Sequence, residues 1–229
     1  TRPMAGAEAI QSTLTNYRDA IRFTHDQTVR RVNQGLTPDE IVEKVKLPAH
    51  LVADPYLAEH YGTVEWSVRS VFDGYMGWFG GDPAELSFDA PEGRAKEIVA
   101  LAGGAPQASA AAEKAYADGQ WKWAAELSGY VGRADAGLKA QADAVQAKAL
   151  RQLGYESVSP NGRNYYLARA AELEKKAPGW AQIIGARQGA QAAGLPASAV
   201  VATFPVRLNA EKAATAQSAM GLRLAGEGD

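Results

Sequence analysis

Residues 10–41 have the period of an amphipathic helix, then a residue that ends a helix, then the start signals of another. This order predicts two consecutive helices. Apolar or weakly polar positions recur at spacings of three, four or seven, as in an amphipathic helix: Ile10, Leu14, Tyr17, Ile21, Thr28 and Val32. Gly35 is placed to end this helix in a left-handed conformation. Thr37, Pro38 and Glu40 then have the spacing of a capping box with proline at the first helical position.

The same helical texture continues through most of the chain. We predict a long helix from Thr63 that ends at the Gly80-Gly81-Asp82-Pro83 run, and a shorter one over residues 91–102. Residues 105–173 are rich in alanine and have the texture of tetratricopeptide-like helical hairpins, with a turn at Gly119. A strict 34-residue repeat is absent from the sequence, so the hairpins are predicted by analogy.

The last fifty residues leave two secondary structures open. Residues 200–208 fit a strand or a helix interrupted at Pro205, and residues 220–224 alternate like a half-buried strand. We therefore predict a mainly α fold: a bundle of long helices, then tetratricopeptide-like hairpins, then a short mixed C-terminal tail.

Composition narrows the function classes. The 229 residues carry a net charge of −2, so no basic field favours nucleic acid or an anionic membrane. No apolar run reaches the roughly 18–20 residues that a membrane span needs. The absence of cysteine excludes disulfides and thiolate metal sites. The chain begins with Thr1 and not Met, so we expect the natural start elsewhere.

The sequence offers no self-contained active site. Its three histidines, His25, His50 and His60, fall in no zinc-binding spacing. No phosphate-binding glycine loop and no Gly-x-Ser-x-Gly elbow occurs. We therefore expect no autonomous catalysis.

His25 has two interpretations, because it lies on the apolar stripe four residues after Ile21. It is either a ligand or substrate contact, or a packed histidine whose ring nitrogens are hydrogen-bonded in a core or dimer seam. We favour the packed histidine, since Asp26 lies on the next helix face and no second metal ligand is near.

Residues 72–81 hold four aromatic residues and four glycines. One interpretation is a core helix whose glycines permit close packing. The other is that Gly74 and Gly77 thin the helix so that a backbone or ligand approaches Tyr75, whose hydroxyl needs a hydrogen-bonding partner.

Several blocks of the sequence, in their order along the chain, resemble the helical dimerisation domain of bacterial alkyl sulfatases, zinc enzymes of the metallo-β-lactamase superfamily. The resemblance covers roughly residues 17–174. The blocks are Tyr17-Arg-Asp-Ala, Asn33-Gln-Gly-Leu-Thr-Pro-Asp-Glu-Ile, Tyr61-Gly-Thr-Val, Tyr75-Met-Gly-Trp, Trp121-Lys-Trp-Ala-Ala-Glu-Leu, Leu150-Arg-Gln-Leu-Gly-Tyr-Glu-Ser and Asn164-Tyr-Tyr-Leu. The segment Phe204-Pro-Val-Arg-Leu is similar to the opening of the family's third, sterol-carrier-like domain.

This resemblance implies a domain division and a role. Residues 1–176 correspond to the dimerisation domain, and residues 177–229 to a linker and the truncated start of the sterol-carrier-like domain. Family members hydrolyse alkyl sulfate esters with two zinc ions held in a metallo-β-lactamase-like catalytic domain. None of the zinc ligands matches a position here, so the resemblance implies a non-catalytic dimerisation and lid region of such an enzyme.

The resemblance also implies partners and one site residue. The partners are a second copy, in a homodimer, and the chain's own catalytic domain, with neither nucleic acid nor membrane. Tyr75 matches, by its Tyr-x-Gly-Trp context, a tyrosine that binds the sulfate group. The opening Thr1-Arg-Pro-Met-Ala-Gly departs from the commoner Trp-Pro-x-Trp-Gly, which leaves the substrate open. The sequence does not determine the compartment either; the parent enzyme could be bacterial and periplasmic or secreted.

We predict that the dimer forms through the helices at residues 10–32 and 64–79, because their stripes are long and aromatic-rich. Two alternatives remain at this stage. One is a free-standing tetratricopeptide-like scaffold that binds a peptide. The other is one piece of a split enzyme that stays bound to its catalytic half.

Overall fold

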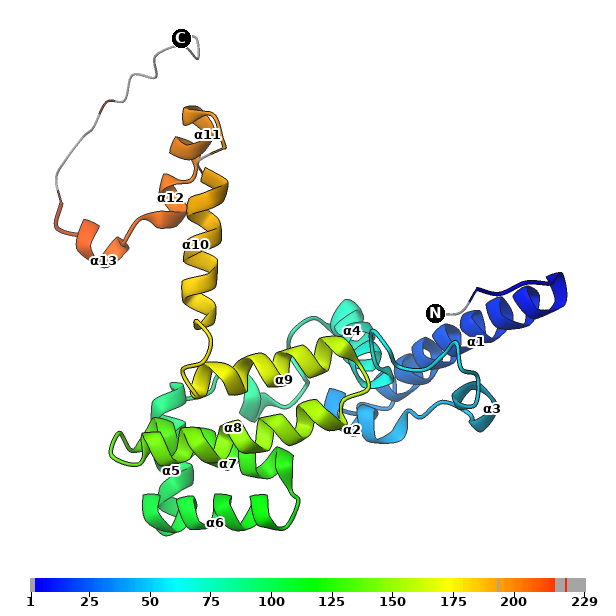
Figure 1. Ribbon diagram of the computed structural model, residues 1–229, viewed down its shortest axis with the longest axis horizontal. Coiled ribbons are helices and arrows are strands. Elements are labelled where there is room, and N and C mark those ends of the chain that lie inside the picture. The colour runs from blue at the N-terminus through cyan, green and yellow to red at the C-terminus, as the bar shows by residue number, and fades with distance from the viewer. Residues whose placement is uncertain (1–2, 193, 217–220, 222–229) are drawn as a thin grey trace. The chain divides into compact units, whose positions relative to one another are not determined.

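The computed structural model describes residues 3–192, 194–216 and 221, and all the regular structure in those ranges is helical (Figure 1). This confirms a mainly α fold. The chain divides into two compact units, Thr1–Ala177 and Pro178–Asp229.

The first helix ends just before Gly35, as predicted. α1 spans Ala7–Val32, and Gly35 adopts a φ of 78°. The Leu36 amide donates to the Arg31 carbonyl at 3.2 Å, and the Gly35 amide to the Val32 carbonyl at 2.9 Å. These two bonds are those of a Schellman motif, which satisfies carbonyls that the end of a helix would otherwise leave unpaired.

The predicted capping box is present. α2 spans Pro38–Lys44, and the Thr37 side chain accepts from the Glu40 amide while the Thr37 amide donates to Glu40 Oε2 at 2.8 Å. The hydrogen bond from the Thr37 amide lowers the pKa of Glu40. The short helix α3, Ala49–Val52, follows.

The fourth helix is shorter than predicted. α4 spans Val64–Met76, with Thr63 as its N-cap. Gly77 takes a φ of 77° and ends the helix three residues before Gly80, where we placed the stop. Trp78 and Phe79 therefore leave the helix, and the prediction for that end was wrong. A single 3₁₀ turn, η1, follows at Pro83–Glu85.

The core of this N-terminal part lies between α2, α4 and the C-terminal half of α1. Its buried side chains are Ile41, Val45, Val68 and Phe72. Each such side chain contributes roughly 1.5–3 kcal/mol on burial. On α1 the buried residues are Ala20, Thr24 and Thr28.

The rest of the first unit is a series of helices joined by short turns: α5 (Pro91–Leu101), α6 (Ala105–Ala117), α7 (Trp121–Ala134), α8 (Lys139–Glu156) and α9 (Pro160–Leu173). From α6 to α9 each helix packs against the next, and α5 packs against α7 (Figure 1). Small side chains such as Ala108, Ala124 and Ala149 are fully buried at the crossings, so the helix axes approach closely. Gly119 makes the α6–α7 turn with a φ of 77°, as predicted.

The second unit is helical in its described part. It contains α10 (Trp180–Ala192), α11 (Ala197–Ala202), α12 (Phe204–Arg207) and α13 (Ala210–Ala213). Of the two alternatives for residues 200–208, the interrupted helix is the one found, with Pro205 in the first turn of α12. The described tail thus holds no strand of the mixed tail that we predicted. The proposed strand at residues 220–224 lies outside the described residues, apart from Gly221.

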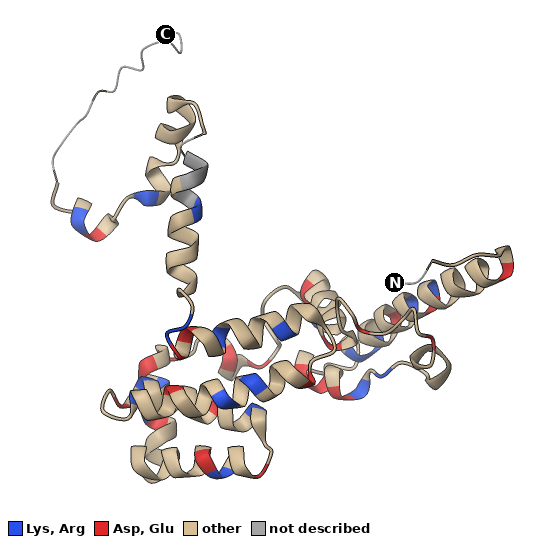
Figure 2. Ribbon diagram, in the orientation of Figure 1, with Lys and Arg blue, Asp and Glu red and all other residues tan. Residues whose placement is uncertain are grey.

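Acidic and basic side chains are interspersed along the helices of the first unit, in keeping with the net charge of −2 (Figure 2). Within the described residues, no helix combines the length and apolarity needed to cross a bilayer.

Candidate functional site

Tyr75, the predicted site residue, lies in the last turn of α4 and is 63% exposed. Its hydroxyl lies 2.9 Å from Nε2 of His25 on α1. The two rings are tilted by 57°, with centroids 5.7 Å apart. The fold therefore joins two residues that the sequence analysis treated separately.

Asp26 completes this arrangement. Its Oδ1 lies 2.8 Å from Nδ1 of His25, although we placed Asp26 on the next face. Both ring nitrogens of His25 thus have partners, as the favoured interpretation expected. The ring is not in a core, however, because the His25 side chain is 43% exposed. The result is a carboxylate, an imidazole and a phenol joined by two hydrogen bonds, and we call these three residues the Tyr75 cluster.

The proton count determines what the Tyr75 cluster can bind. An ionised Asp26 only accepts, so Nδ1 of His25 carries a proton and donates to it. In neutral His25, Nε2 then accepts the single proton of the Tyr75 hydroxyl, and the phenol oxygen can only accept. When Nε2 is also protonated it donates to the phenol oxygen, and the Tyr75 proton is free for an anion. Anion binding by Tyr75 therefore requires a proton on Nε2 or the loss of the His25 bond.

The glycines beside Tyr75 have different roles from each other. A Cβ at Gly74 would meet no atom within 4 Å, so no other described segment uses the space that this glycine leaves. Gly77 does not thin the helix at all, since it is the residue that ends α4.

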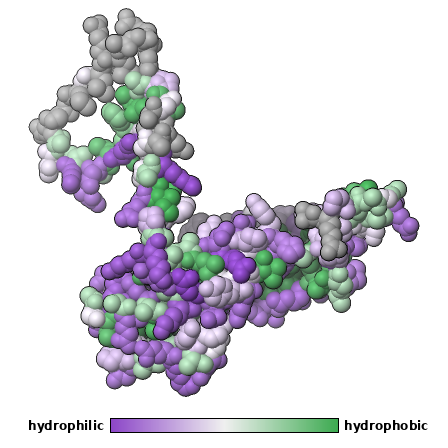
Figure 3. Space-filling view, viewed as in Figure 1, coloured by the Kyte–Doolittle hydropathy of each residue, from purple (hydrophilic) through white to green (hydrophobic). Residues whose placement is uncertain are grey.

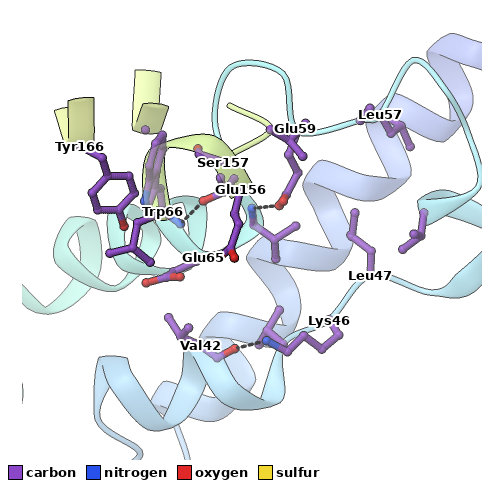
Figure 4. A pocket seen from close by; sticks show the side chains of 18 of the residues that line it. Val42, Lys46, Leu47, Leu57, Glu59, Glu65, Trp66, Glu156, Ser157 and Tyr166 are labelled. Carbon is purple, nitrogen blue, oxygen red and sulfur yellow. Dashed lines mark hydrogen bonds between the residues drawn. The ribbon is translucent and has the colours of Figure 1, made fainter. Parts of the chain in front are cut away.

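The fold also forms an apolar cavity of about 700 Å³ that the residue pattern did not predict (Figure 4). It lies between α2, the segment leading into α4, and the α8–α9 hairpin. Its lining includes Val42, Leu57, Trp66 and Tyr166. No local spacing signals such a cavity, because its walls come from positions more than a hundred residues apart.

Three charged side chains of the cavity lining have protein partners. Lys46 Nζ donates to the Val42 carbonyl at 3.0 Å, and Glu59 accepts from the Val64 amide at 2.6 Å. Glu156 accepts from Nε1 of Trp121 at 2.9 Å. The bond of Glu156 connects the end of α8 to the start of α7, whereas the other two bonds are local.

The described residues also bear on the two zinc ions that the resemblance implies. Nowhere in residues 3–192, 194–216 and 221 do three or more His, Asp or Glu side chains gather in a way that would hold a metal ion. The residues present therefore do not fit a zinc site.

Large apolar side chains are exposed over the N-terminal half of α1, where hydrophobic residues gather in Figure 3. Ile10, Leu14, Tyr17 and Ile21 are between 42% and 64% exposed, and we call these four residues the α1 stripe. Beyond the end of α4, Trp78 and Phe88 are exposed as well, with the Arg94 guanidinium 4.3 Å from the Phe88 ring centre.

Comparison with known proteins identifies the class. The alkyl sulfatase dimerisation family matches residues 37–176, more than half of the chain. The chain therefore belongs to this family, as the resemblance predicted. The description of this family is that of a dimerisation domain.

Individual relatives agree with this assignment. A linear primary-alkylsulfatase from a Pseudomonas species is 44% identical over 228 residues, which covers 96% of this chain and 43% of that protein. An alkyl/aryl-sulfatase of Saccharomyces cerevisiae is 36% identical and covers 77% of this chain and 27% of its own length.

The fold agrees as well. The solved structure of the stereoselective inverting sec-alkylsulfatase Pisa1 from Pseudomonas sp. superposes with a TM-score of 0.72 at 33% identity. The match covers 77% of this chain and 28% of that one. The chain thus spans less than half the length of each of these relatives.

Proposed function

We propose that the chain is the non-catalytic dimerisation and active-site lid region of a zinc-dependent alkyl sulfatase, an enzyme that hydrolyses alkyl sulfate esters to alcohol and sulfate. The observation that carries this proposal is the match to a primary-alkylsulfatase over 96% of the chain but only 43% of the relative. The partners are a second copy and the chain's own metallo-β-lactamase-like catalytic domain.

The assignment of the two zinc ions to that other domain follows from chemistry. Zinc in a catalytic site needs three or more nitrogen or oxygen ligands from the protein. The described residues offer no such group. We therefore assign both metal ions, and the hydrolytic step, to the part of the enzyme outside this chain.

We also propose the domain division predicted above, with residues 1–176 as the helical domain and residues 177–229 as a linker and the truncated start of a sterol-carrier-like domain. The change of compact unit between Ala177 and Pro178 supports this boundary. The consecutive packing of α6 to α9 supports the tetratricopeptide-like description of the hairpins.

Tyr75 is proposed as the residue that contacts the sulfate group of the substrate. The exposure of Tyr75 and the His25–Asp26 pair beside its hydroxyl support this role. When both ring nitrogens of His25 carry a proton, the Tyr75 proton is free for the anion.

Replacing Tyr75 by phenylalanine in the full-length enzyme tests this role. A hydrogen bond to a charged group contributes about 1.5–3 kcal/mol, so kcat/KM for an alkyl sulfate is expected to fall about ten- to a hundredfold. Tyr165→Phe, at an exposed tyrosine on α9, is the matched control and should leave kcat/KM unchanged. The chain by itself is the blank and should release no sulfate.

The outcomes separate the parts of the proposal. An unchanged kcat/KM in Tyr75→Phe would remove Tyr75 from the sulfate site and leave the dimerisation role standing. Zinc-dependent release of sulfate by the isolated chain would overturn the non-catalytic role itself.

A further inference from the structure

The apolar cavity beside α2 lies between two parts of the first unit that are held together by hydrogen bonds and close packing. The Tyr61 carbonyl, in the segment before α4, accepts from Oγ of Ser159 at 2.7 Å and from Nδ2 of Asn161 at 3.3 Å. Gly162, in the first turn of α9, allows this helix to approach Trp66, because a Cβ there would lie 3.3 Å from the indole ring. The walls of the cavity are therefore fixed against each other by the chain itself, as in most small-molecule sites.

The walls are suited to a hydrocarbon chain. The cavity volume of about 700 Å³ falls in the range of roughly 300–1,000 Å³ that is typical of small-molecule sites. Val52 and Val158 of the lining are 66% and 63% exposed, so the cavity is open to solvent at these positions. An alkyl chain would cover the apolar lining without needing a hydrogen-bonding partner. The half-buried apolar side chains of the lining include Val42, Leu47, Leu57, Val64, Leu153 and Tyr166.

The charged side chains of the lining determine which head group fits. Three are carboxylates, Glu59, Glu65 and Glu156, and two are ammonium groups, Lys46 and Lys122. Three negative charges against two positive charges give an anionic head group no net attraction. A hydroxyl group is neutral and donates a hydrogen bond. A carboxylate has about four acceptor sites, so the bonds that these three make within the chain leave capacity for a hydroxyl.

We propose that this cavity binds a linear primary alcohol, with the alkyl chain along the apolar walls and the hydroxyl group donating to a carboxylate of the lining. Figure 4 shows carboxylate and apolar side chains around the same space, so one amphiphilic molecule can contact both. Such an alcohol is a product of the reaction assigned to the parent enzyme, and this link alone rests on the proposed function. The cavity then offers the released alcohol a binding place on the helical domain.

The head group separates the alcohol from its own sulfate ester. An alkyl sulfate of the same chain length makes the same apolar contacts. Its head group only accepts hydrogen bonds and carries a negative charge, so it gains nothing from the three carboxylates and is repelled by them. The cavity is therefore selective for the alcohol over the ester.

Isothermal titration calorimetry of the whole 229-residue chain with hexan-1-ol, octan-1-ol and decan-1-ol tests the site. Each buried methylene strengthens transfer from water about fourfold, so the affinity is expected to rise about fifteenfold for every two carbons. The binding should saturate at one alcohol per chain. Octyl sulfate should bind about tenfold more weakly than octan-1-ol, because of the charge on its head group.

Two substitutions locate the bound alcohol. Val158→Trp places a large side chain at an exposed position of the lining, and it is expected to weaken octan-1-ol binding about tenfold or more by occupying the space of the alkyl chain. Val52→Trp, also in the lining, does the same from α3. Val206→Trp, at an 86% exposed position of α12 outside the lining, is the matched control and should bind octan-1-ol as the unsubstituted chain does. Circular dichroism confirms that each variant is folded.

The other outcomes would overturn the proposal in different ways. The absence of saturable binding for all three alcohols would remove the site. Binding that survives in both Val158→Trp and Val52→Trp would place the alcohol elsewhere on the chain. Octyl sulfate that binds as tightly as octan-1-ol would overturn the selectivity for a neutral head group. None of these results bears on dimerisation or on Tyr75, which are tested by molecular mass and by kcat/KM, so a failure here is distinct from a failure of the proposed function.

Discussion

Two glycines in the helices of the first unit have opposite surroundings, although the sequence gives both the same appearance. A Cβ on Gly154 of α8 would lie 2.7 Å from Cδ2 and 2.9 Å from Cγ of Leu167 on α9. A Cβ on Gly74 of α4 would meet no atom within 4 Å. The first glycine is thus required by packing, and the second is not.

We expect Gly154→Ala to lower the free energy of unfolding by about 1–2 kcal/mol, because the methyl group forces α9 outward and outweighs the better helix propensity of alanine. Gly74→Ala is the matched control and should raise it by about 0.5–1 kcal/mol. Urea denaturation of the three proteins measures both changes. Shifts of the same sign and size would show that the α8–α9 contact has no part in the effect.

Two residues of the Tyr75 cluster could be singled out from the sequence, but their contact could not. The Tyr-x-Gly-Trp context singled out Tyr75, and the apolar stripe singled out His25. Their hydrogen bond joins positions fifty residues apart, and no spacing rule predicts it. The contact of Asp26 with His25 was also missed, because a side chain can reach beyond the helix face on which its Cα lies.

At the scale of elements, one bidentate ion pair connects α8 to the end of α9. Arg151 donates from Nε and a terminal nitrogen to the two oxygens of Glu174, at 2.8 and 2.6 Å. Lys176 lies 2.7 Å from the same carboxylate. The hydrogen bonds from Arg151, and then those from Lys176, lower the pKa of Glu174 from 4.5 to about 2.

Because the pKa of Glu174 is lowered in the folded state, its ion pair with Arg151 stabilises the fold at neutral pH. Acid removes this stabilisation. The contribution is complete above pH 4.5 and is lost as the pH falls toward 2, where the carboxylate takes up a proton in the folded state as well. We expect the thermal midpoint of the chain to exceed that of Glu174→Gln at pH 6, and the difference to close near pH 2. A difference that stays constant across this range would exclude the ion pair as its cause.

The element ends differ in how well they could be predicted. The Thr37 capping box and the Gly35 stop follow from residues within one turn of each other, so the sequence pattern was sufficient. The end of α4 was misplaced because three glycines, Gly77, Gly80 and Gly81, each offer a stop. Gly77 ends α4 in the structure, and the residue pattern does not rank it above the other two.

At the scale of the whole molecule, the α1 stripe leaves four large apolar side chains exposed. Leu14→Asp places a charge at the centre of this stripe, where pairing would remove it from water. We expect the unsubstituted chain to be a dimer at micromolar concentration and the variant to shift toward monomer in light scattering. Ser12→Asp, on the opposite face of α1, is the control and should remain dimeric. Equal masses for the two variants would place the dimer contact elsewhere.

Local physics decided much of this protein from its sequence alone. Helical periodicity, caps and glycine stops depend on hydrogen bonds and side chains within about four residues. The mainly α fold, the Thr37 cap, the Gly35 stop and the Gly119 turn could therefore be predicted directly. The order of the sequence blocks was also sufficient to recognise the dimerisation family.

Tertiary structure alone decided three further features. It determined which half of the apolar face of α1 is buried by the chain's own helices. It also determined that Tyr75 is hydrogen-bonded to His25 and that Trp66 lines a cavity with the α8–α9 hairpin. Each of these depends on the packing of elements that are distant in the chain. A repeat of three and four residues shows that a helix has an apolar face, but the partner that covers this face is chosen by long-range packing, within the chain or between two copies.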